Sequence, residues 1–241
     1  MRKPWKWIVG AVVVVAIALV VGPWVYINFI QEDAPPELQL TDATANTTDA
    51  TRAPGSTSAT TAPETAGATG IDGTWNVGEG STAGYRAKEV LFGQDADAAG
   101  RTDQVTGSME ISGTTVTTGS FEVDMASVES DQSNRDDAYR GRIMNVDQFP
   151  TSTFELTTPI ELGSIPEEGV AIHPQATGDI TIHGVTKTVT IDLDAQLIDG
   201  KIEVVGHLPV KWSDFDIDDP SGGPATVTDN GQMEFKLVLS R

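Results

Sequence analysis

The stretch Gly178–Ile191, GDITIHGVTKTVTI, decides the fold class of this chain. Apolar and polar residues alternate on both sides of His183-Gly184, as they do in strands that bury one face. Two linking residues with glycine second fit a type I′ turn, so the stretch predicts a β-hairpin with His183 at its corner. His173 and His207 lie in separate segments, and no His-x-His or His-Glu-x-x-His spacing occurs. A turn role for His183 is therefore favoured over catalysis or metal binding.

Similar alternating segments recur from Ile71 to the C-terminal end, separated by Gly, Asp, Asn and Pro. They amount to about eight or nine strands with short connections, which predicts an antiparallel sandwich or barrel. One stretch breaks the pattern. There, Ser133 or Asn134 could cap a short helix that runs to about Asn145 and ends before Pro150.

The N-terminal segment has a different character. Ile8–Ile30 contains no charged residue, and about 20 apolar residues suffice to cross a bilayer. Arg2, Lys3 and Lys6 precede this segment, and Gln31–Asp33 follow it. The positive-inside rule then predicts a single-pass membrane anchor with residues 1–30 forming a cytoplasmic stub and transmembrane helix, and with the rest of the chain outside. A cleaved signal peptide is the alternative, but the segment is long for one and lacks a small-x-small site after it.

Residues 31–70 are mostly Ala, Thr, Ser, Pro, Gly and Asp, and no large apolar side chain follows Leu40 within this stretch. Such a segment cannot bury enough surface to offset its ordering entropy, so we expect a disordered extracytoplasmic linker. Residues 71–241 then form the folded domain.

Charge and cysteine content exclude several functions. The chain carries 15 Lys and Arg against 35 Asp and Glu, a net charge of −20. Such a surface repels nucleic acid, so we expect no nucleic-acid partner. There is no cysteine, which excludes a disulfide scaffold, a thiolate metal site and a cysteine nucleophile.

The acidic run near the C-terminus is the one candidate metal site. Asp214, Asp216 and Asp218 alternate, and oxygen ligands at this spacing suggest a calcium loop. However, the EF-hand pattern requires Gly at Asp219 and Glu at Ala225, so an acidic turn is the favoured interpretation. No nucleophile elbow, dinucleotide fingerprint or phosphate loop occurs. We therefore expect no catalytic residue, metal or cofactor, and a protein that is not an enzyme.

Three stretches resemble the bacterial YceI-like family, also called polyisoprenoid-binding or lipid-binding proteins. Gly178–Ile191 is close to that family's GxLTIxGVTKxVxL hairpin. Asn134–Glu155 is similar to its RDxHL…YPxxxF segment, although Asp137-Ala138 stands in place of His-Leu. Val210–Asp218 lies where the family has an RxDFGI-like stretch, and the resemblance covers residues 71–241. It implies an all-β, antiparallel eight-stranded lipocalin-like barrel with one short helix, here preceded by a single transmembrane helix.

The resemblance also implies one long amphiphile, such as a polyisoprenoid, isoprenoid quinone or fatty acyl derivative, in an apolar pore. We expect it to contact apolar side chains on the strand faces: Trp75, Phe92, Met109, Phe121, Met125, Phe154, Ile182, Ile191, Trp212, Phe215 and Phe235. For each of them, packed core is the competing role, because both roles need the same side chains. For Arg135-Asp136 a structural ion pair or a helix cap is the favoured interpretation, and the alternative is that Arg135 contacts a phosphate or carbonyl headgroup at the pore mouth.

These expectations combine into a membrane-tethered, extracytoplasmic binding protein of the cell envelope. Its expected partners are the lipid ligand, the membrane through the N-terminal helix, and a second copy of the chain as a candidate homodimer. Two other functions stay open. A filled barrel could serve as a structural or interaction module, and a quinone-linked stress enzyme would need a polar group inside the pore.

Overall fold

The computed structural model describes residues 21, 25, 34–42 and 70–241. The predicted transmembrane segment lies almost wholly outside these residues, as do the cytoplasmic stub and most of the predicted linker. No helix found among the residues just given is long and apolar enough to span a bilayer.

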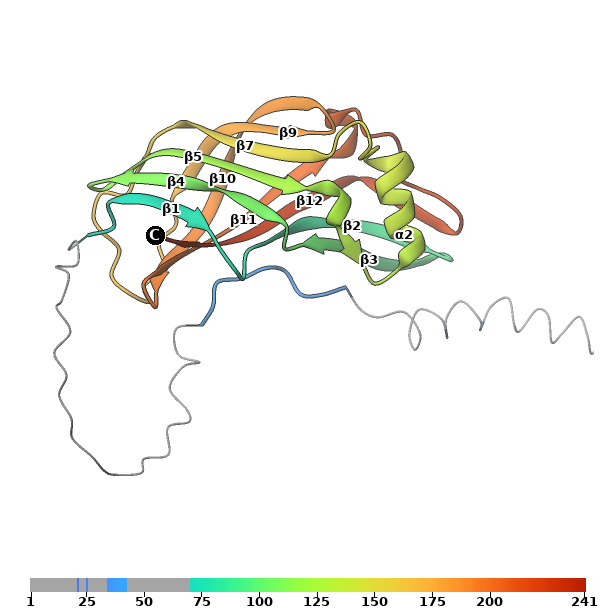
Figure 1. Ribbon diagram of the computed structural model, residues 1–241. Helices are drawn as coiled ribbons and strands as arrows, with labels where there is room; N and C mark the ends of the chain where they lie inside the picture. Colours follow the sequence, from blue (N-terminus) through green and yellow to red (C-terminus); the bar gives the residue numbers. More distant parts are fainter. Residues whose placement is uncertain (1–20, 22–24, 26–33, 43–69) are drawn as a thin grey trace, which may run out of the picture.

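The folded domain is built almost entirely from strands (Figure 1). The strands are β1 (Gly73–Val77), β2 (Thr82–Leu91), β3 (Gln94–Thr102), β4 (Val105–Ser112), β5 (Thr115–Asp124), β6 (Glu129–Ser130), β7 (Thr151–Thr158), β8 (Ile160–Glu161), β9 (Gln175–Ile182), β10 (Val185–Ile198), β11 (Lys201–Lys211) and β12 (Ala225–Ser240). The helical segments are η2 (Met125–Ser127), α2 (Ser133–Ala138), η3 (Tyr139–Ile143) and η4 (Trp212–Phe215).

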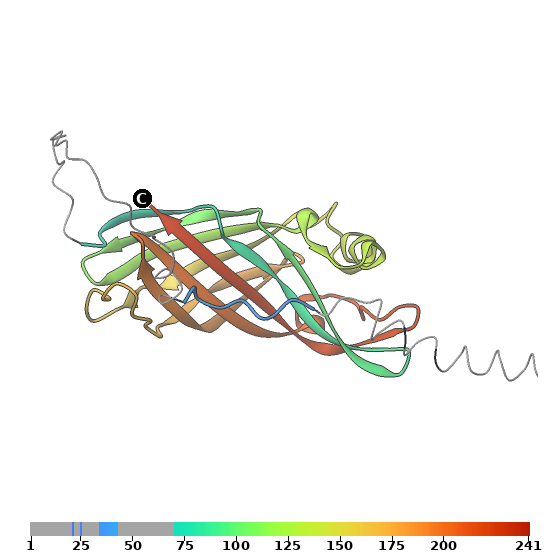
Figure 2. The ribbon, with the colours of Figure 1, turned by 90° about the horizontal axis from the view of Figure 1, so that it is seen from below.

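Eight strands close into an antiparallel barrel in the order β1-β4-β5-β7-β9-β10-β11-β12, with β12 pairing back to β1. The long strand β12 pairs with β11 along one edge and with two strands in turn along its other edge. Its last residues, Leu239 and Ser240, pair with β1, whereas Ala225–Lys236 pair with β2. Strands β3 and β6 extend the sheet from β2, and the barrel therefore opens toward the end that carries α2 (Figures 1 and 2). The predicted eight-stranded antiparallel barrel with one short helix is confirmed.

The β9–β10 hairpin is also confirmed, with the turn predicted from sequence. His183 and Gly184 have φ values of +50° and +77°, the left-handed pair that a type I′ turn needs, and Ile182 pairs with Val185 across it. His183 Nδ1 lies 3.2 Å from the carbonyl oxygen of Phe215, and the ring packs edge-on against Phe149 with centroids 4.5 Å apart. The histidine therefore secures the turn against its neighbours.

The short helix begins differently from the prediction. Gln132 occupies the N-cap position without a side-chain cap, so the prediction of Ser133 or Asn134 as the cap is wrong. Instead, the Asp136 carboxylate accepts hydrogen bonds from the Ser130 backbone N–H (2.9 Å) and hydroxyl (2.6 Å). This contact from inside the first turn ties the helix to β6. The helix then widens into the π-helical turn η3, which ends at Ile143 and not at Asn145.

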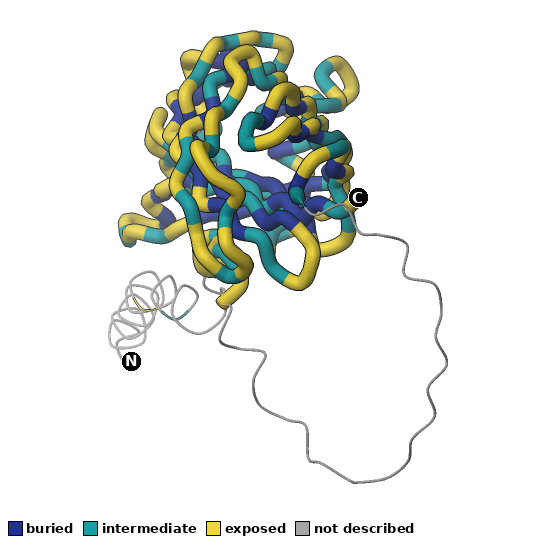
Figure 3. The backbone as a smooth tube through the Cα atoms, turned by 90° about the vertical axis from the view of Figure 1, so that its left-hand side faces the viewer, coloured by how far each residue is buried: buried dark blue, intermediate teal, exposed yellow. Residues whose placement is uncertain are grey.

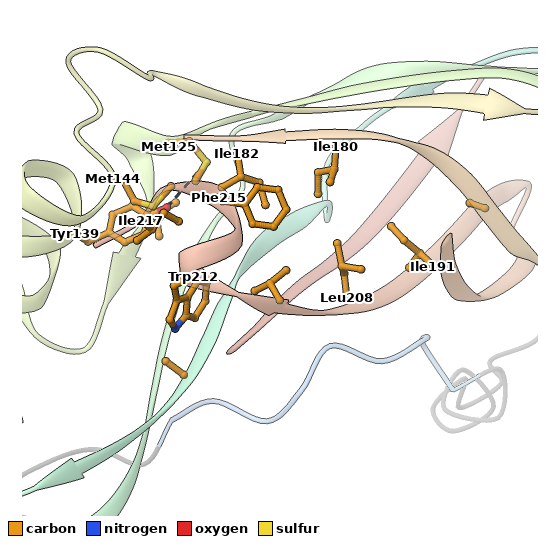
Figure 4. Close-up of a cluster of buried hydrophobic side chains, with 14 of the residues drawn as sticks. Met125, Tyr139, Met144, Ile180, Ile182, Ile191, Leu208, Trp212, Phe215 and Ile217 are labelled. Atoms are coloured by element: carbon orange, nitrogen blue, oxygen red, sulfur yellow. Dashed lines mark hydrogen bonds between the residues drawn. The ribbon is translucent and has the colours of Figure 1, made fainter. Parts of the chain in front are cut away.

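The apolar side chains form two clusters along the barrel. One surrounds Trp75 and Leu239 at the end closed by β1. The other runs from the middle of the barrel to the helical end, where Met125, Tyr139 and Met144 lie close together (Figure 4). Viewed end on, buried positions lie along the strands while exposed positions concentrate on the turns (Figure 3).

Residues 34–42 fall within the stretch expected to be a disordered linker, yet they have defined positions against the barrel wall. They run in an extended path along the outside of β12 and β11, beneath them in Figure 1 and in front of them in Figure 2. Thr41, for example, donates its backbone N–H to Glu203 on β11 at 2.9 Å. The expectation of disorder does not hold for these nine residues.

Candidate functional site

The closed barrel is hollow. It contains a cavity of about 190 Å³, which we call the lumen. Its lining is apolar on nearly every strand, including Val105, Met109, Val116, Phe121, Phe154, Leu156, Ile180, Ile191, Leu193, Ile202, Val204, Phe235 and Leu237. A filled barrel, which the sequence left open, is not what the structure has.

Two phenylalanine rings stay close to the wall because glycines on neighbouring strands leave room for them. A Cβ atom on Gly206 would lie 2.3 Å from Phe235 Cζ, and one on Gly178 would lie 2.5 Å from Phe154 Cζ. Such distances are far inside van der Waals contact, so only glycine permits these ring positions. Gly206 pairs directly with Phe235 across β11 and β12. The rings cover glycine backbone, and the centre of the barrel stays open.

A second cavity of about 750 Å³, which we call the vestibule, lies at the helical end. It is bounded by β2, the α2–η3 segment, Trp212 and the 220–225 loop. Met125, Tyr139 and Met233 line both the lumen and the vestibule. These three side chains therefore form the boundary between the two cavities. Methionine is flexible, and such a boundary can adapt to a chain passing through it.

Two tyrosines stiffen this boundary. The rings of Tyr85 and Tyr139 stack with centroids 5.1 Å apart and planes 9° apart. The Tyr139 hydroxyl lies 4.0 Å from Met125 Sδ (Figure 4). Burial raises the pKa of Tyr85 to about 12, and burial also raises the pKa of Tyr139. Both phenols are therefore neutral at physiological pH and serve as packing groups.

Arg135 lies on the vestibule lining with its charge already compensated. Its guanidinium is 3.2 Å from Glu89 Oε1 and also pairs with Asp131. Burial lowers the pKa of Arg135, but the carboxylates of Asp131 and Glu89 outweigh burial, and the pKa lies above its ordinary value. Its partner is thus not Asp136, whose carboxylate binds Ser130. The structure gives Arg135 an ion-pair role, and contact with a ligand headgroup stays a prediction.

A second arginine, Arg142, also lines the vestibule, and sequence reasoning did not single it out. Its guanidinium donates to the backbone carbonyls of Asp219 (3.3 Å), Pro220 (2.7 Å) and Ser221 (3.0 Å). These bonds hold the 219–221 loop beside the π-helical turn and so shape one side of the vestibule.

The predicted pore residues divide into three groups. The first lines the lumen: Met109, Phe121, Met125, Phe154, Ile191 and Phe235. The second lines the vestibule: Phe92, Ile182 and Trp212, together with Met125 again. The third, Trp75 and Phe215, belongs to neither lining. Whether any of them touches a ligand stays a prediction.

The two residues outside the cavities have packing roles. The Trp75 indole N–H donates to the Ile71 carbonyl at 2.8 Å, and the Arg241 guanidinium lies 4.6 Å above the Trp75 ring centre. Phe215 is buried beside the hairpin corner, with Lys187 Nζ 5.7 Å from its ring centre. Trp75 thus belongs to the packed cluster around Leu239, and Phe215 belongs to the cluster that includes Met125 and Tyr139.

Several lining residues were missed by sequence reasoning. Leu156, Leu193 and Leu237 each stand two positions from a predicted residue on the same strand. Strand alternation alone would have found them. Tyr139 and Met233 could not have been recognised in this way as boundary residues, because their role depends on how η3 meets β12.

The acidic run shows no metal-binding arrangement. Asp214 faces Lys187, with Oδ1 3.6 Å from Nζ, and Asp219 accepts the backbone N–H of Ser221 at 2.9 Å. Among residues 34–42 and 70–241, no group of three or more His, Asp and Glu side chains is placed to hold a metal ion. The acidic run consists of η4, which contains Asp214 and ends at Asp216, and of the irregular segment that follows it.

The fold and its cavities define a class: a closed, antiparallel eight-stranded barrel with an apolar interior suited to a lipid chain. Comparison with known families agrees. The YceI-like domain family matches residues 75–239, well over half of the sequence, and the chain belongs to that family.

Solved structures share the fold. The chain is similar to a polyisoprenoid binding domain from Saccharophagus degradans implicated in plant cell wall breakdown, with a TM-score of 0.56 and 14% identity, covering 69% of this chain and 97% of that one. It is also similar to Burkholderia cenocepacia BcnA, with a TM-score of 0.50 and 20% identity, covering 65% and 95%. At these identities the likeness shows the fold alone. No curated protein matches the chain.

Proposed function

We propose that this protein is a membrane-anchored binding protein on the extracytoplasmic side, and that it holds one long-chain amphiphile without catalysing a reaction. The observation that carries the proposal is the apolar lumen, which meets the larger vestibule at a boundary of two methionines and one tyrosine. The ligand's hydrocarbon chain would lie in the lumen, and its polar end in the vestibule.

The lining chemistry supports binding by burial. Apart from Tyr139, the residues with amide, hydroxyl or carboxylate side chains at the lumen lining are Ser152, Thr153, Gln196 and Glu234. The side chains of Gln196 and Glu234 point outward, where they bind the backbone of Thr41 and Leu38. The Ser152 hydroxyl donates to the Thr181 carbonyl at 2.8 Å, and Arg101 pairs with Glu234 at 2.8 Å. Gln196 donates to Glu203 at 3.0 Å. Because the Ser152 hydroxyl is already hydrogen-bonded and the Gln196 and Glu234 side chains are bound on the outer side of the wall, the lumen selects for apolar surface and not for a particular headgroup.

The ligand class follows from the same lining. A polyisoprenoid, an isoprenoid quinone and a fatty acyl chain all present the apolar surface that this lumen would accept. The similar Saccharophagus degradans domain is described as polyisoprenoid binding. Each buried methylene contributes about 0.8 kcal/mol, so affinity would grow with chain length by up to roughly fourfold per methylene until the lumen is full.

The membrane anchor is supported by the uncharged Ile8–Ile30 segment and by the charges on its two sides. An anchor would keep the barrel beside the bilayer, which is the source of such ligands. A homodimer has no comparable support.

The test is a titration of the full chain, reconstituted in lipid nanodiscs, with fluorescent acyl chains and polyisoprenoids of graded length. We expect saturable one-to-one binding that tightens with chain length. The variant Ala176→Trp would fill the lumen, since Ala176 is a buried lining residue, and should abolish binding. Thr118→Trp on the exposed face of β5 is the matched control and should bind normally. Binding that is insensitive to Ala176→Trp, or that is absent for every chain tested, would overturn the proposal.

A further inference from the structure

Residues 34–42, which we call the strap, cross the outer wall of the barrel. Pro35 and Pro36 lie beside β2 and β3, and Thr41 lies beside the β10–β11 end of the wall (Figure 2). The strap therefore runs from the vestibule end toward the end that β1 closes. Its two prolines favour an extended backbone before docking, which lowers the entropy cost of binding.

The first anchoring point is Glu234 on β12, whose side chain is fully buried. Its carboxylate accepts from Arg86 Nε at 3.3 Å and from Arg101 Nε at 2.9 Å. The Leu38 backbone N–H donates to the same carboxylate at 3.3 Å. Both arginines also donate to the carbonyls of Pro35–Pro36. The strap backbone thus completes the coordination of a buried ion cluster.

The second anchoring point is Glu203 on β11. The backbone N–H and hydroxyl of Thr41 donate to this carboxylate at 2.9 and 2.8 Å. Gln196 donates to the Thr41 carbonyl at 2.8 Å and to Glu203 at 3.0 Å. Lys236 Nζ lies 3.2 Å from Glu203 and 2.8 Å from the Thr41 hydroxyl. Every polar group of Thr41 is therefore bound by the wall.

The wall itself is unusual for an outer surface. Glu203, Val205 and Glu234 point outward from the barrel, because Glu203 and Glu234 bind the strap and Val205 shares the face of Glu203. Yet these three residues are only 7%, 1% and 1% exposed. Carboxylates this deeply buried are costly unless they are paired and hydrogen-bonded. The strap supplies part of that pairing.

We propose that the strap is a docking element that holds the vestibule end of the barrel against the membrane. The inference rests on the membrane anchor of the proposed function. Pro35 follows Ile30 by five residue steps, and a fully extended chain of that length spans at most about 17 Å. Arg86, beside Pro35, is six residues before Phe92 at the tip of the β2–β3 turn, or about 20 Å along a strand. The tip and the vestibule behind it would therefore meet the bilayer surface.

Docking changes how the barrel can move. If residues 31–70 were an undocked, flexible linker, its root-mean-square end-to-end distance would be roughly 35 Å. The barrel would then have no preferred orientation relative to the membrane. A docked strap reduces the free connection to residues 31–33. A lipid could then pass between the bilayer and the vestibule without crossing water.

The first experiment measures whether the strap docks. In the full chain in nanodiscs, we expect the amides of Leu38 and Thr41 to exchange hydrogen at least about tenfold more slowly than that of Gln39, which is exposed and makes no hydrogen bond to the described part of the wall. Glu203→Gln should speed exchange at Thr41. Glu110→Gln, which removes the same charge from an exposed position on β4, should not. Equal, fast exchange at all three amides would overturn the strap.

The second experiment measures orientation. The chain has no cysteine, so single cysteines at Gln94 and Lys201 can each carry one fluorophore. These positions begin β3 at the vestibule end and β11 at the opposite end. Energy transfer to labelled lipid headgroups should be several-fold higher from Gln94→Cys than from Lys201→Cys, and Glu203→Gln should reduce the difference. If energy transfer from the two positions were equal while the strap amides stayed protected, the strap would still dock, but the proposed orientation of the barrel would be wrong. A chain that fails to stay with vesicles would instead overturn the proposed anchor, while amide exchange would still decide whether the strap docks.

Discussion

The open lumen depends on glycine at position 206, and Gly206→Ala tests this dependence. The added Cβ would lie 2.3 Å from Phe235 Cζ, 2.7 Å from Phe235 Cε1 and 3.0 Å from Leu193 Cδ2. Ordinary carbon contacts begin near ~3.5 Å, so the ring tip must retreat by roughly 1 Å. The β11–β12 backbone is fixed by its pairing, and the ring can move only toward the lumen.

Two effects should follow from Gly206→Ala. Overpacking of this kind costs about 1–3 kcal/mol, which for a domain of this size lowers the melting temperature by roughly 2–10 °C. The displaced ring also narrows the lumen, so long-chain ligands should bind more weakly. Adding Phe235→Leu removes the clash and should recover part of both losses, a coupling of about 0.5–3 kcal/mol in a double-mutant cycle.

The assay is thermal unfolding and ligand titration of the full chain. Gly141→Ala is the matched control, because a Cβ on Gly141 meets no atom within 4 Å and its φ is not left-handed. It should leave binding unchanged and stability equal or slightly higher. If Gly206→Ala had the same melting temperature and ligand affinity as Gly141→Ala, the position of the Phe235 ring would not depend on Gly206.

Three further predictions concern the boundary, the phenols and the strap. Met233→Trp should obstruct the boundary between lumen and vestibule and weaken binding of long chains more than of short ones, measured by titration with graded chain lengths. Because the pKa of Tyr85 is raised to about 12 in the fold, the stability that its neutral form contributes is complete below pH ~10 and lost as the pH rises toward 12. The free energy of unfolding in urea and the phenolate absorbance would both be measured between pH 9 and 12. Ionisation of Tyr85 near its ordinary pKa would contradict this prediction. Burial raises the pKa of Glu203, but hydrogen bonds from Thr41 and Gln196 and the charge of Lys236 outweigh burial and lower it. Strap docking should therefore persist above the ordinary glutamate pKa and weaken as the pH falls below it. The readout is exchange of the Thr41 amide, corrected for the intrinsic effect of pH on exchange. Protection of this amide that does not change with pH would contradict the prediction.

The hairpin could be predicted from sequence because its signals are local. Alternation sets the strands, and a glycine after His183 sets the turn. Strand β3 could not be predicted from sequence, because it lacks such a local signal. Its buried positions are Ala98, Ala99, Gly100 and Thr102, which are too small or too polar to produce an apolar pattern, and the strand is specified by main-chain pairing with β2.

The division between lumen and core could not be predicted. Trp75 and Phe154 look alike in sequence, as large apolar residues in alternating strands. Their roles separate only in three dimensions, because the Phe154 ring rests on Gly178 of a neighbouring strand whereas Trp75 is enclosed at the barrel end beneath Arg241.

The strap could not be predicted from sequence, because it lies within a longer segment of linker-like composition. Residues 31–70 as a whole have the composition of a disordered tether. The signal lies in the nine residues of the strap, where Leu38 and Leu40 alternate with polar residues after two prolines, and both leucines are half-buried. The partners Glu203 and Glu234 looked like ordinary solvent-facing acids, because alternation says which face a residue takes and not what covers that face.

The most direct test of the proposed binding is photo-crosslinking with a diazirine placed along a long acyl or isoprenoid chain, followed by mass mapping of the labelled peptides. A chain held in the lumen predicts adducts on lining residues of β5, β10 and β12, such as Phe121, Ile191 and Phe235, and their loss when unlabelled ligand competes. Adducts confined to outward-facing positions, or no competable adduct at all, would contradict lipid binding in the barrel.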